Sequence, residues 1–387
     1  MIFYLKIKFM WNYQYLSRID FRIIPIILGL MVMSLLVISA YSLEGSAEIT
    51  EERFITPMVR QQIQWFIIGG FVFIFFAGFD YNKLRELAWI LYALVLLSLV
   101  GLFFTDSIAR VNRWYRLPFL NISFQPSEYA KLIVVITLSW FLERTKTDSH
   151  SFRTAFFSMI IVGIPFILIL KQPDLGTALV LFPITLVMFY FGDIHPQIIK
   201  AMTFVASIVL IVVALIFLGV LPHEKLRPYA SLILKDYQFD RLNPYTHHQK
   251  SASIAIGIGG LTGVGFRKSE YTSGGWLPAA YTDSVFPAFG EEFGFIGLLL
   301  MLMLFYALIY FSFQVSVVAK DHFGRLLSAG ITVYLAMHIL VNIGMMSGFL
   351  PITGVPLVLV TYGGSSTLST MMALGILQSI YSRRFMF

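Results

Sequence analysis

Long uninterrupted apolar runs dominate the chain, and polar residues are confined to the segments between them. Ten runs come close to the roughly 20 residues that an α-helix needs to cross a bilayer. The strands of a membrane barrel would be near ten residues long and would alternate in character, unlike these continuous runs. The pattern therefore predicts an all-α polytopic membrane protein with about ten transmembrane helices, at about residues 22–43, 63–79, 84–104, 128–143, 154–171, 176–192, 201–220, 294–318, 326–348 and 362–381.

The composition supports this class. Hydrophobic residues make up 58% of the 387 residues and charged residues 13%, whereas a soluble domain carries roughly 25% charged residues. The first 20 residues are aromatic and basic without a small-residue cleavage site, so we expect the first span to serve as the insertion signal. The chain has no cysteine, which excludes a disulfide framework, thiolate catalysis and a zinc–thiolate site.

The positions of Lys and Arg predict the orientation, because basic residues accumulate in cytoplasmic loops. Fourteen of them fall in the segments that are inner if the N-terminus is cytoplasmic, and six fall in the short outer segments. We therefore expect both termini inside and one integral-membrane domain over residues 1–387. A long outer loop, about 221–283, then lies between the seventh and eighth spans, and loops of this length usually carry function.

The stretch from Trp276 to Gly297 places three carboxylates at the edge of an apolar span: Asp283, Glu291 and Glu292. Ionisable groups at a bilayer are costly and are therefore functional candidates. The competing interpretation is that Asp283 only caps the helix that follows, because Asp is a favoured N-cap residue.

A second stretch, from Arg110 to Lys131, brings arginines to the outer face, against the usual distribution. Arg110 and Arg113 beside Trp114 suit an anionic ligand such as a pyrophosphate, which a guanidinium grips through several donors. The alternative is an interfacial anchor. Glu128 and Lys131, three residues apart on one helix face, form either a substrate contact or a buried ion pair.

Other motifs are weaker on their own. Asp174 lies in a tight turn whose backbone it could simply satisfy. The Pro- and Gly-rich stretch 342–366 breaks a helical pattern at membrane depth, which persists only where protein or a wet cavity covers the backbone. The glycines of 257–265 match no nucleotide-binding motif, and we expect them to let the loop fold closely against the membrane surface. The pair His247 and His248 has no partner at ligand spacing, and we expect His338 to be hydrogen-bonded within the bundle.

Several of these motifs, in this order, resemble the SEDS family (shape, elongation, division and sporulation), and its elongation branch more than its division branch. They are NRWYR, QPSEYAK, QPDLGT, the segment YTHHQKSASIAIGIGGLTGVGF, LPAAYTDSVF before GEEFG, and NIGM with LPITGVPL and YGGSS. The family's essential aspartate matches Asp283, and its outer-cavity pair matches Glu128 and Lys131. The chain departs from the family at Ala279, Tyr281 and Ser284, and in having LVLVTYGGSS.

The resemblance implies a peptidoglycan glycosyltransferase of the bacterial inner membrane that polymerises lipid II for cell elongation and rod shape. Its implied partner is a class B penicillin-binding protein, and no nucleic acid partner is expected. Asp283 would take the proton of the acceptor hydroxyl. The pyrophosphate would be bound by Arg110, Arg113 and Lys131, with Mg²⁺ or Mn²⁺ as a candidate cofactor.

The remaining predicted site residues are substrate contacts (Trp114, Gln125, Glu128 and Asp174) and supporting carboxylates (Glu291 and Glu292). If Glu291 and Glu292 lie close to Asp283, they would raise its pKa, whereas a helix N-terminus would lower it. Two alternatives remain open: a flippase for the same lipid-linked precursor, and a scaffold that only recruits the penicillin-binding protein.

Overall fold

The computed structural model describes residues 11–41, 54–105, 113–117, 122–230 and 239–385. Within these residues, a long helix forms at each of the ten predicted apolar runs. The helices are α2 (Ile23–Tyr41), α3 (Pro57–Gly78), α4 (Asn82–Gly101, continued by η2, Leu102–Phe104), α5 (Pro126–Arg144), α6 (Phe152–Lys171), α7 (Leu175–Phe191), α8 (Pro196–Phe217), α13 (Val285–Val318), α14 (His322–Met346) and α15 (Gly364–Ser382).

Seven helices in the described part of the chain are long and apolar enough to cross a membrane: α2, α3, α4 with η2, α6, α8, α13 and α14. The chain is therefore an all-α, multi-pass membrane protein. Helices α5 and α15 fall outside this set because they carry many polar residues, most of them buried in the bundle. A helix that faces other helices does not need an apolar surface all round.

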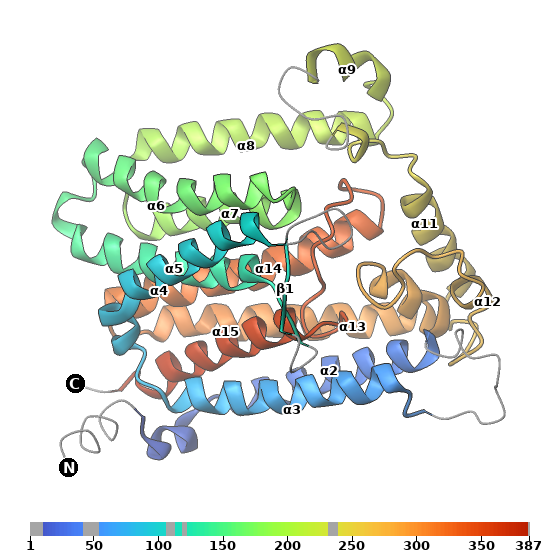
Figure 1. Cartoon of the computed structure of the whole chain (residues 1–387), viewed down its shortest axis with the longest axis horizontal. Helices are drawn as coiled ribbons and strands as arrows, with labels where there is room; N and C mark the ends of the chain where they lie inside the picture. The colour runs from blue at the N-terminus through green and yellow to red at the C-terminus, as the bar shows by residue number, and fades with distance from the viewer. Residues whose placement is uncertain (1–10, 42–53, 106–112, 118–121, 231–238, 386–387) are drawn as a thin grey trace.

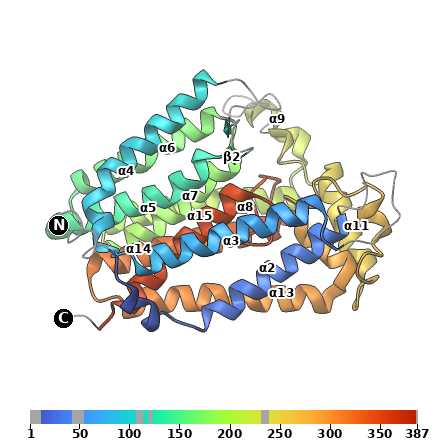
Figure 2. The ribbon, with the colours of Figure 1, turned by 60° about the horizontal axis from the view of Figure 1, so that its bottom comes forward.

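The core lies around α5, α14 and α15, whose residues are mostly buried. Helix α15 packs along α3, and α14 packs against α13, α7 and α5. Figure 2 shows α2 lying beside α13, although they are far apart in sequence. Helix α8 runs along one side of the bundle with Ile216 as its single buried residue (Figure 1).

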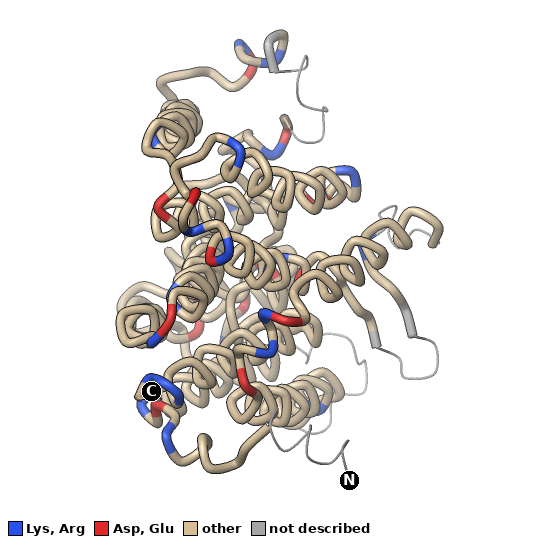
Figure 3. The backbone as a smooth tube through the Cα atoms, turned by 90° about the vertical axis from the view of Figure 1, so that its left-hand side faces the viewer, with Lys and Arg blue, Asp and Glu red and all other residues tan. Residues whose placement is uncertain are grey.

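The first and last described segments meet at one end of the bundle (Figure 1). The backbone N–H of Asp20 donates to Gln378 Oε1 at 2.7 Å, and Arg383 Nη2 donates to the Gly78 carbonyl at 2.9 Å. Figure 3 looks at this end, where basic and acidic segments alternate over the near ends of the helices. Helices α9 (His223–Ala230), α11 (His247–Gly259) and α12 (Glu270–Ser273) lie at the opposite end.

Helix α13 is broken at Gly294, where φ is 63° and ψ is −164°. The glycine-rich loop after α11 satisfies the backbone freed by the break: Phe295 N donates to the Gly260 carbonyl at 2.8 Å, and Val264 N donates to the Glu291 carbonyl at 3.0 Å. A Cβ on Gly263 would lie 2.0 Å from the Glu292 carbonyl oxygen. The close approach of Gly259 and Gly263 is therefore to α13. That the glycines let the loop fold closely against the membrane surface stays a prediction.

The segment before α5 contains a small hairpin that was not predicted. Strands β1 (Tyr115–Leu117) and β2 (Ile122–Phe124) pair antiparallel, with Tyr115 opposite Phe124. The Tyr115 hydroxyl donates to the Ser98 carbonyl at 2.7 Å, which fixes the hairpin over the end of α4. Strands of three residues carry too little alternation to be recognised in a sequence.

Candidate active site

A cavity of about 260 Å³ opens between the start of α3, the segment before α5, the turn before α13 and the loop between α14 and α15. Its wall combines two tryptophans with hydroxyl and amide groups and one carboxylate, that of Asp283. Aromatic faces with polar groups between them suit a ligand that is apolar on its faces and rich in hydroxyls at its edges. The lining residues are Gln61, Trp65, Trp114, Ser123, Gln125, Thr282, Asp283, Gly354, Pro356, Thr361, Tyr362, Gly363, Gly364, Ser365 and Ser366.

The carboxylate of Asp283 has no hydrogen-bond partner among the described residues. Helix α13 begins at Val285, its N-cap residue is Ser284, and no side chain caps it. The capping interpretation of Asp283 is therefore not what the structure shows.

The surroundings of Asp283 raise its pKa above the ordinary value of 3.8. Burial is the main cause, because it penalises the charged form. The Asp174 carboxylate also raises the pKa of Asp283, whereas the positive charges of Arg241 and Arg113 lower it. Glu291 and Glu292 would have raised this pKa if they lay close to Asp283, but the carboxylate that acts on Asp283 belongs to Asp174.

A compact turn presents Asp283 to the cavity. The N–H groups of Thr282 and Ser284 both donate to the Ala279 carbonyl, at 3.0 and 3.1 Å. The Ser284 hydroxyl donates to the Pro278 carbonyl at 2.8 Å and lies 2.6 Å from His248 Nε2. His248, in α11, thus has a structural partner in Ser284, the N-cap of α13, which the sequence did not reveal.

Arg113 is held against the turn that precedes α7. Its Nε donates to the Gln172 carbonyl at 3.1 Å, its Nη2 donates to the Pro173 carbonyl, and its Nη1 lies 4.0 Å from Asp174 Oδ1. Its side chain is 20% exposed, so part of it remains accessible to solvent. Trp114 lines the cavity, and Arg110 lies outside the described residues.

Asp174 is the N-cap of α7, with Oδ1 accepting from Thr177 N at 3.3 Å. The interpretation that it satisfies turn backbone is therefore confirmed. Its Oδ2 also accepts from Gln125 Nε2 at 3.3 Å and from Ser127 Oγ at 3.1 Å. Gln125 lines the cavity, so Asp174 supports the wall from behind.

Glu128 and Lys131 form the buried ion pair that was one of the two alternatives, with 2.8 Å between Lys131 Nζ and Glu128 Oε1. Lys131 Nζ also lies 2.7 Å from His338 Nε2, and Lys131 is 0% exposed. Direct binding of a ligand by Lys131 is not available in this arrangement, because its ammonium is enclosed and already paired. His338 is hydrogen-bonded within the bundle, as expected, but its contact with Lys131 could not be predicted from the sequence.

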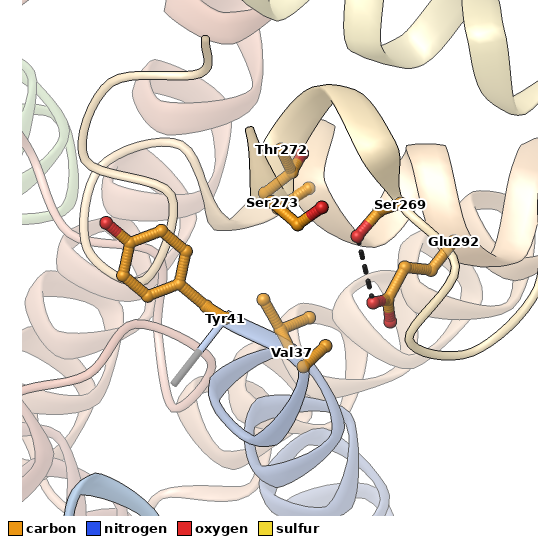
Figure 4. A pocket seen from close by; sticks show the side chains of 8 residues that line it. Val37, Tyr41, Ser269, Thr272, Ser273 and Glu292 are labelled. Atoms are coloured by element: carbon orange, nitrogen blue, oxygen red, sulfur yellow. Dashed lines mark hydrogen bonds between the residues drawn. The ribbon is translucent and has the colours of Figure 1, made fainter. Parts of the chain in front are cut away.

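Glu291 and Glu292 hold the loop that follows α11. Glu291 accepts from the N–H groups of Tyr271 and Thr272, both at 3.0 Å, at the start of α12. Glu292 Oε1 accepts from Ser269 Oγ at 3.3 Å (Figure 4). The pocket beside Glu292 has about 10 Å³ of accessible space, roughly that of one water molecule. Both residues are therefore supports, and neither lines the cavity beside Asp283.

The candidate divalent cation finds no ready set of ligands. Among the described residues, no group of three or more His, Asp or Glu side chains lies close enough together to hold a metal ion. We therefore derive no step through a metal.

The chain is similar to known cell-wall proteins over nearly its whole length. A model of the FtsW, RodA and SpoVE family, described as "Cell cycle protein", matches residues 21–384. Peptidoglycan glycosyltransferase MrdB of Escherichia coli K12 is 30% identical over 368 residues, covering 95% of this chain and 94% of that protein. The probable peptidoglycan glycosyltransferase FtsW of Geobacter sulfurreducens is 31% identical over 339 residues, covering 84% of this chain and 85% of that protein.

Solved structures share the fold. A chain from the structure described as "Structural coordination of polymerization and crosslinking by a peptidoglycan synthase complex" superposes with a TM-score of 0.75 at 22% identity, covering 95% of this chain and 99% of that one. The rod shape determining protein RodA of Thermus thermophilus superposes with a TM-score of 0.67 at 21% identity, covering 95% and 98%. The chain belongs to the FtsW, RodA and SpoVE family, the SEDS family that its motifs indicated, as a RodA-like member.

Proposed function

We propose that this chain polymerises lipid II into glycan strands for cell elongation, with Asp283 as the general base. That the chain is a peptidoglycan glycosyltransferase follows from its family and from relatives of that name aligned over almost their full length. The observation that carries the proposal is the Asp283 carboxylate, which lies at the cavity and accepts no hydrogen bond from the described residues.

The chemistry requires a base because a sugar hydroxyl is a poor nucleophile until its proton is removed. Asp283 takes the proton of the acceptor's 4-hydroxyl as that oxygen attacks the anomeric carbon of the growing strand. The carbon inverts, and the undecaprenyl pyrophosphate leaves with the bonding electrons. A raised pKa strengthens Asp283 as a base compared with an ordinary carboxylate, provided that it remains ionised at the working pH.

The leaving pyrophosphate needs positive charge rather than a proton. Arg113 is the described candidate, with Arg110 three residues earlier in the chain. Lys131 acts from behind the cavity wall, with Glu128 fixing its position. Trp114 and Gln125 contact the substrate, and Asp174 holds Gln125 in place.

The cavity then faces the outside of the inner membrane. We propose ten spans with both termini cytoplasmic, an outer loop over about 221–283, and one domain over residues 1–387. The positions of α11 and α12, at the end away from the terminal segments, support this orientation (Figure 1). Because the native chain has no cysteine, a single cysteine placed in the loop should be labelled from outside only, and one appended after Phe387 from inside only. Labelling of both from one side would overturn this topology.

We also propose a class B penicillin-binding protein as partner. The support is the similarity to a chain from a peptidoglycan synthase complex that couples polymerisation to crosslinking. Glycan strands formed from lipid II by the purified chain would establish the activity. Transport of lipid II across vesicles without polymer would favour the flippase alternative instead.

A further inference from the structure

Two buried polar residues lie one turn apart on the same face of α14. His338 and Asn342 are 1% and 0% exposed, and a spacing of four residues places their side chains on one helix face. His338 Nδ1 lies 3.2 Å from the Pro356 carbonyl oxygen, and Asn342 Nδ2 donates to the Val355 carbonyl at 2.8 Å. The two side chains therefore hold adjacent carbonyls of the non-helical stretch between α14 and α15.

Each side chain makes a second bond toward a functional cluster. Asn342 Nδ2 also donates to the backbone carbonyl of Asp283 at 3.1 Å. His338 Nε2 lies 2.7 Å from Lys131 Nζ. An ammonium can only donate, so Nε2 is the acceptor, and the ring proton is on Nδ1, facing the Pro356 carbonyl.

Between these two clusters runs part of the cavity wall, since Gly354 and Pro356 both line the cavity. A Cβ on Gly354 would lie 3.4 Å from Asp283 Oδ2, so this stretch passes directly beside the carboxylate. Through Asn342 and His338, one turn of α14 thus contacts the Asp283 backbone, the Val355–Pro356 backbone in the cavity wall, and Lys131.

We propose that Asn342 and His338 are positioning residues that fix Asp283 and Lys131 relative to each other across the Val355–Pro356 backbone. The inference rests on the proposed role of Asp283 as base and names how this chain sets the geometry of the reaction. Asn342 holds the backbone that carries the base, and His338 holds the ammonium behind the wall.

A purely structural role is the competing explanation. A buried carbonyl without a donor destabilises a protein, so His338 and Asn342 could serve only to satisfy the chain break. That explanation predicts less folded protein but normal turnover by the molecules that fold. The positioning role predicts a loss of kcat in folded protein, because displacing a catalytic group by about 1 Å can cost on the order of 10²-fold.

The test measures kcat and KM for lipid II polymerisation per folded molecule of the full chain. Asn342→Leu removes both donors at similar volume, and we expect kcat to fall on the order of 10²-fold with KM little changed. The matched control is Gln378→Leu, which loses a buried amide that accepts from Asp20 N at 2.7 Å at the opposite end. We expect its kcat to stay at the wild-type level.

Two substitutions separate the bonds of His338. His338→Gln can keep an acceptor at the Nε2 position for Lys131, and His338→Asn can keep a donor at the Nδ1 position for the Pro356 carbonyl. We expect His338→Gln to retain more kcat than His338→Asn. Equal kcat for the two would overturn the role of His338, even if Asn342→Leu does not fold.

Asp283→Asn in the same assay separates the possible failures. If Asp283→Asn is inactive but Asn342→Leu has the same kcat as Gln378→Leu, this inference is overturned and the proposed function stands. An active Asp283→Asn would overturn the proposed function, and this inference with it.

Discussion

Replacing Asp283 by Asn tests the base directly, because the change keeps the shape of the side chain and removes its ability to accept a proton. We expect polymerisation by the purified chain to fall on the order of 10²–10⁴-fold, the range attributed to a general base. At about 1.4 kcal/mol for each tenfold, this corresponds to roughly 3–5.5 kcal/mol in the activation barrier.

The same substitution should not weaken the fold. Burial raises the pKa of Asp283, so the folded state favours the protonated form. Ionisation of this group therefore costs stability, and the cost is present once the pH exceeds the raised pKa. Asparagine removes that cost, and we expect the Tm of Asp283→Asn at neutral pH to equal or exceed that of the wild type.

Asp283→Glu adds one methylene and pushes the carboxylate toward Gly354, which already passes close to it. We expect partial activity at best, since displacement by about 1 Å can cost on the order of 10²-fold. Glu270→Gln, which removes an exposed carboxylate from α12, is the matched control and should polymerise normally. The assay follows glycan strands made from lipid II, normalised to folded protein. Near-wild-type polymerisation by Asp283→Asn would refute the role of Asp283 as the general base.

Two further pairs of variants test the electrostatics and the packing. Arg113→Gln removes a charge that lowers the pKa of Asp283, so the acid limb of the kcat/KM profile should move to higher pH. Asp174→Asn removes a charge that raises this pKa, so the acid limb should move to lower pH. Movement in the same direction for both variants would contradict the assignment of Asp283 as the base. In α11, a Cβ on Gly259 would lie 2.0 Å from the Gly290 carbonyl oxygen, whereas one on Gly257 meets nothing within 4 Å. Gly259→Ala should therefore lower the Tm, with an overpacking cost of about 1–3 kcal/mol, and Gly257→Ala should hold or raise it.

The helices were largely predictable because burial in a bilayer and in a bundle both select long apolar runs. The start of α3 shows the limit of that signal. The predicted run begins at residue 63, but the helix begins at Pro57, after the N-cap Thr56. Gln61 and Gln62 interrupt the apolar run, so the first turns of α3 were not predicted. Gln61 nevertheless belongs to the helix and lines the cavity. A polar residue in a membrane helix thus marked a cavity rather than a helix end.

The site was predictable only where local sequence carries the chemistry. Asp283, Trp114 and Gln125 stood in motifs, and all three line the cavity. The bonds of Asn342 and His338 could not be predicted, because they join segments 59 and 207 residues away. Nothing in the local pattern of α14 distinguishes a side chain that bonds Asp283 from one that only fills the bundle.

The carboxylates of Glu128, Asp174, Asp283, Glu291 and Glu292 differ mainly in how their oxygens are satisfied, and this difference separates their roles. Asp174 and Glu291 accept hydrogen bonds on both oxygens. Glu128 and Glu292 each accept on one oxygen, and the other oxygen is buried without a partner among the described residues. Neither residue lines the cavity beside Asp283. Asp283 combines a place in the cavity wall with a carboxylate that no described group occupies. A base must keep a lone pair free for a substrate proton, so Asp283 is the described carboxylate that can act on a bound sugar without first breaking a bond.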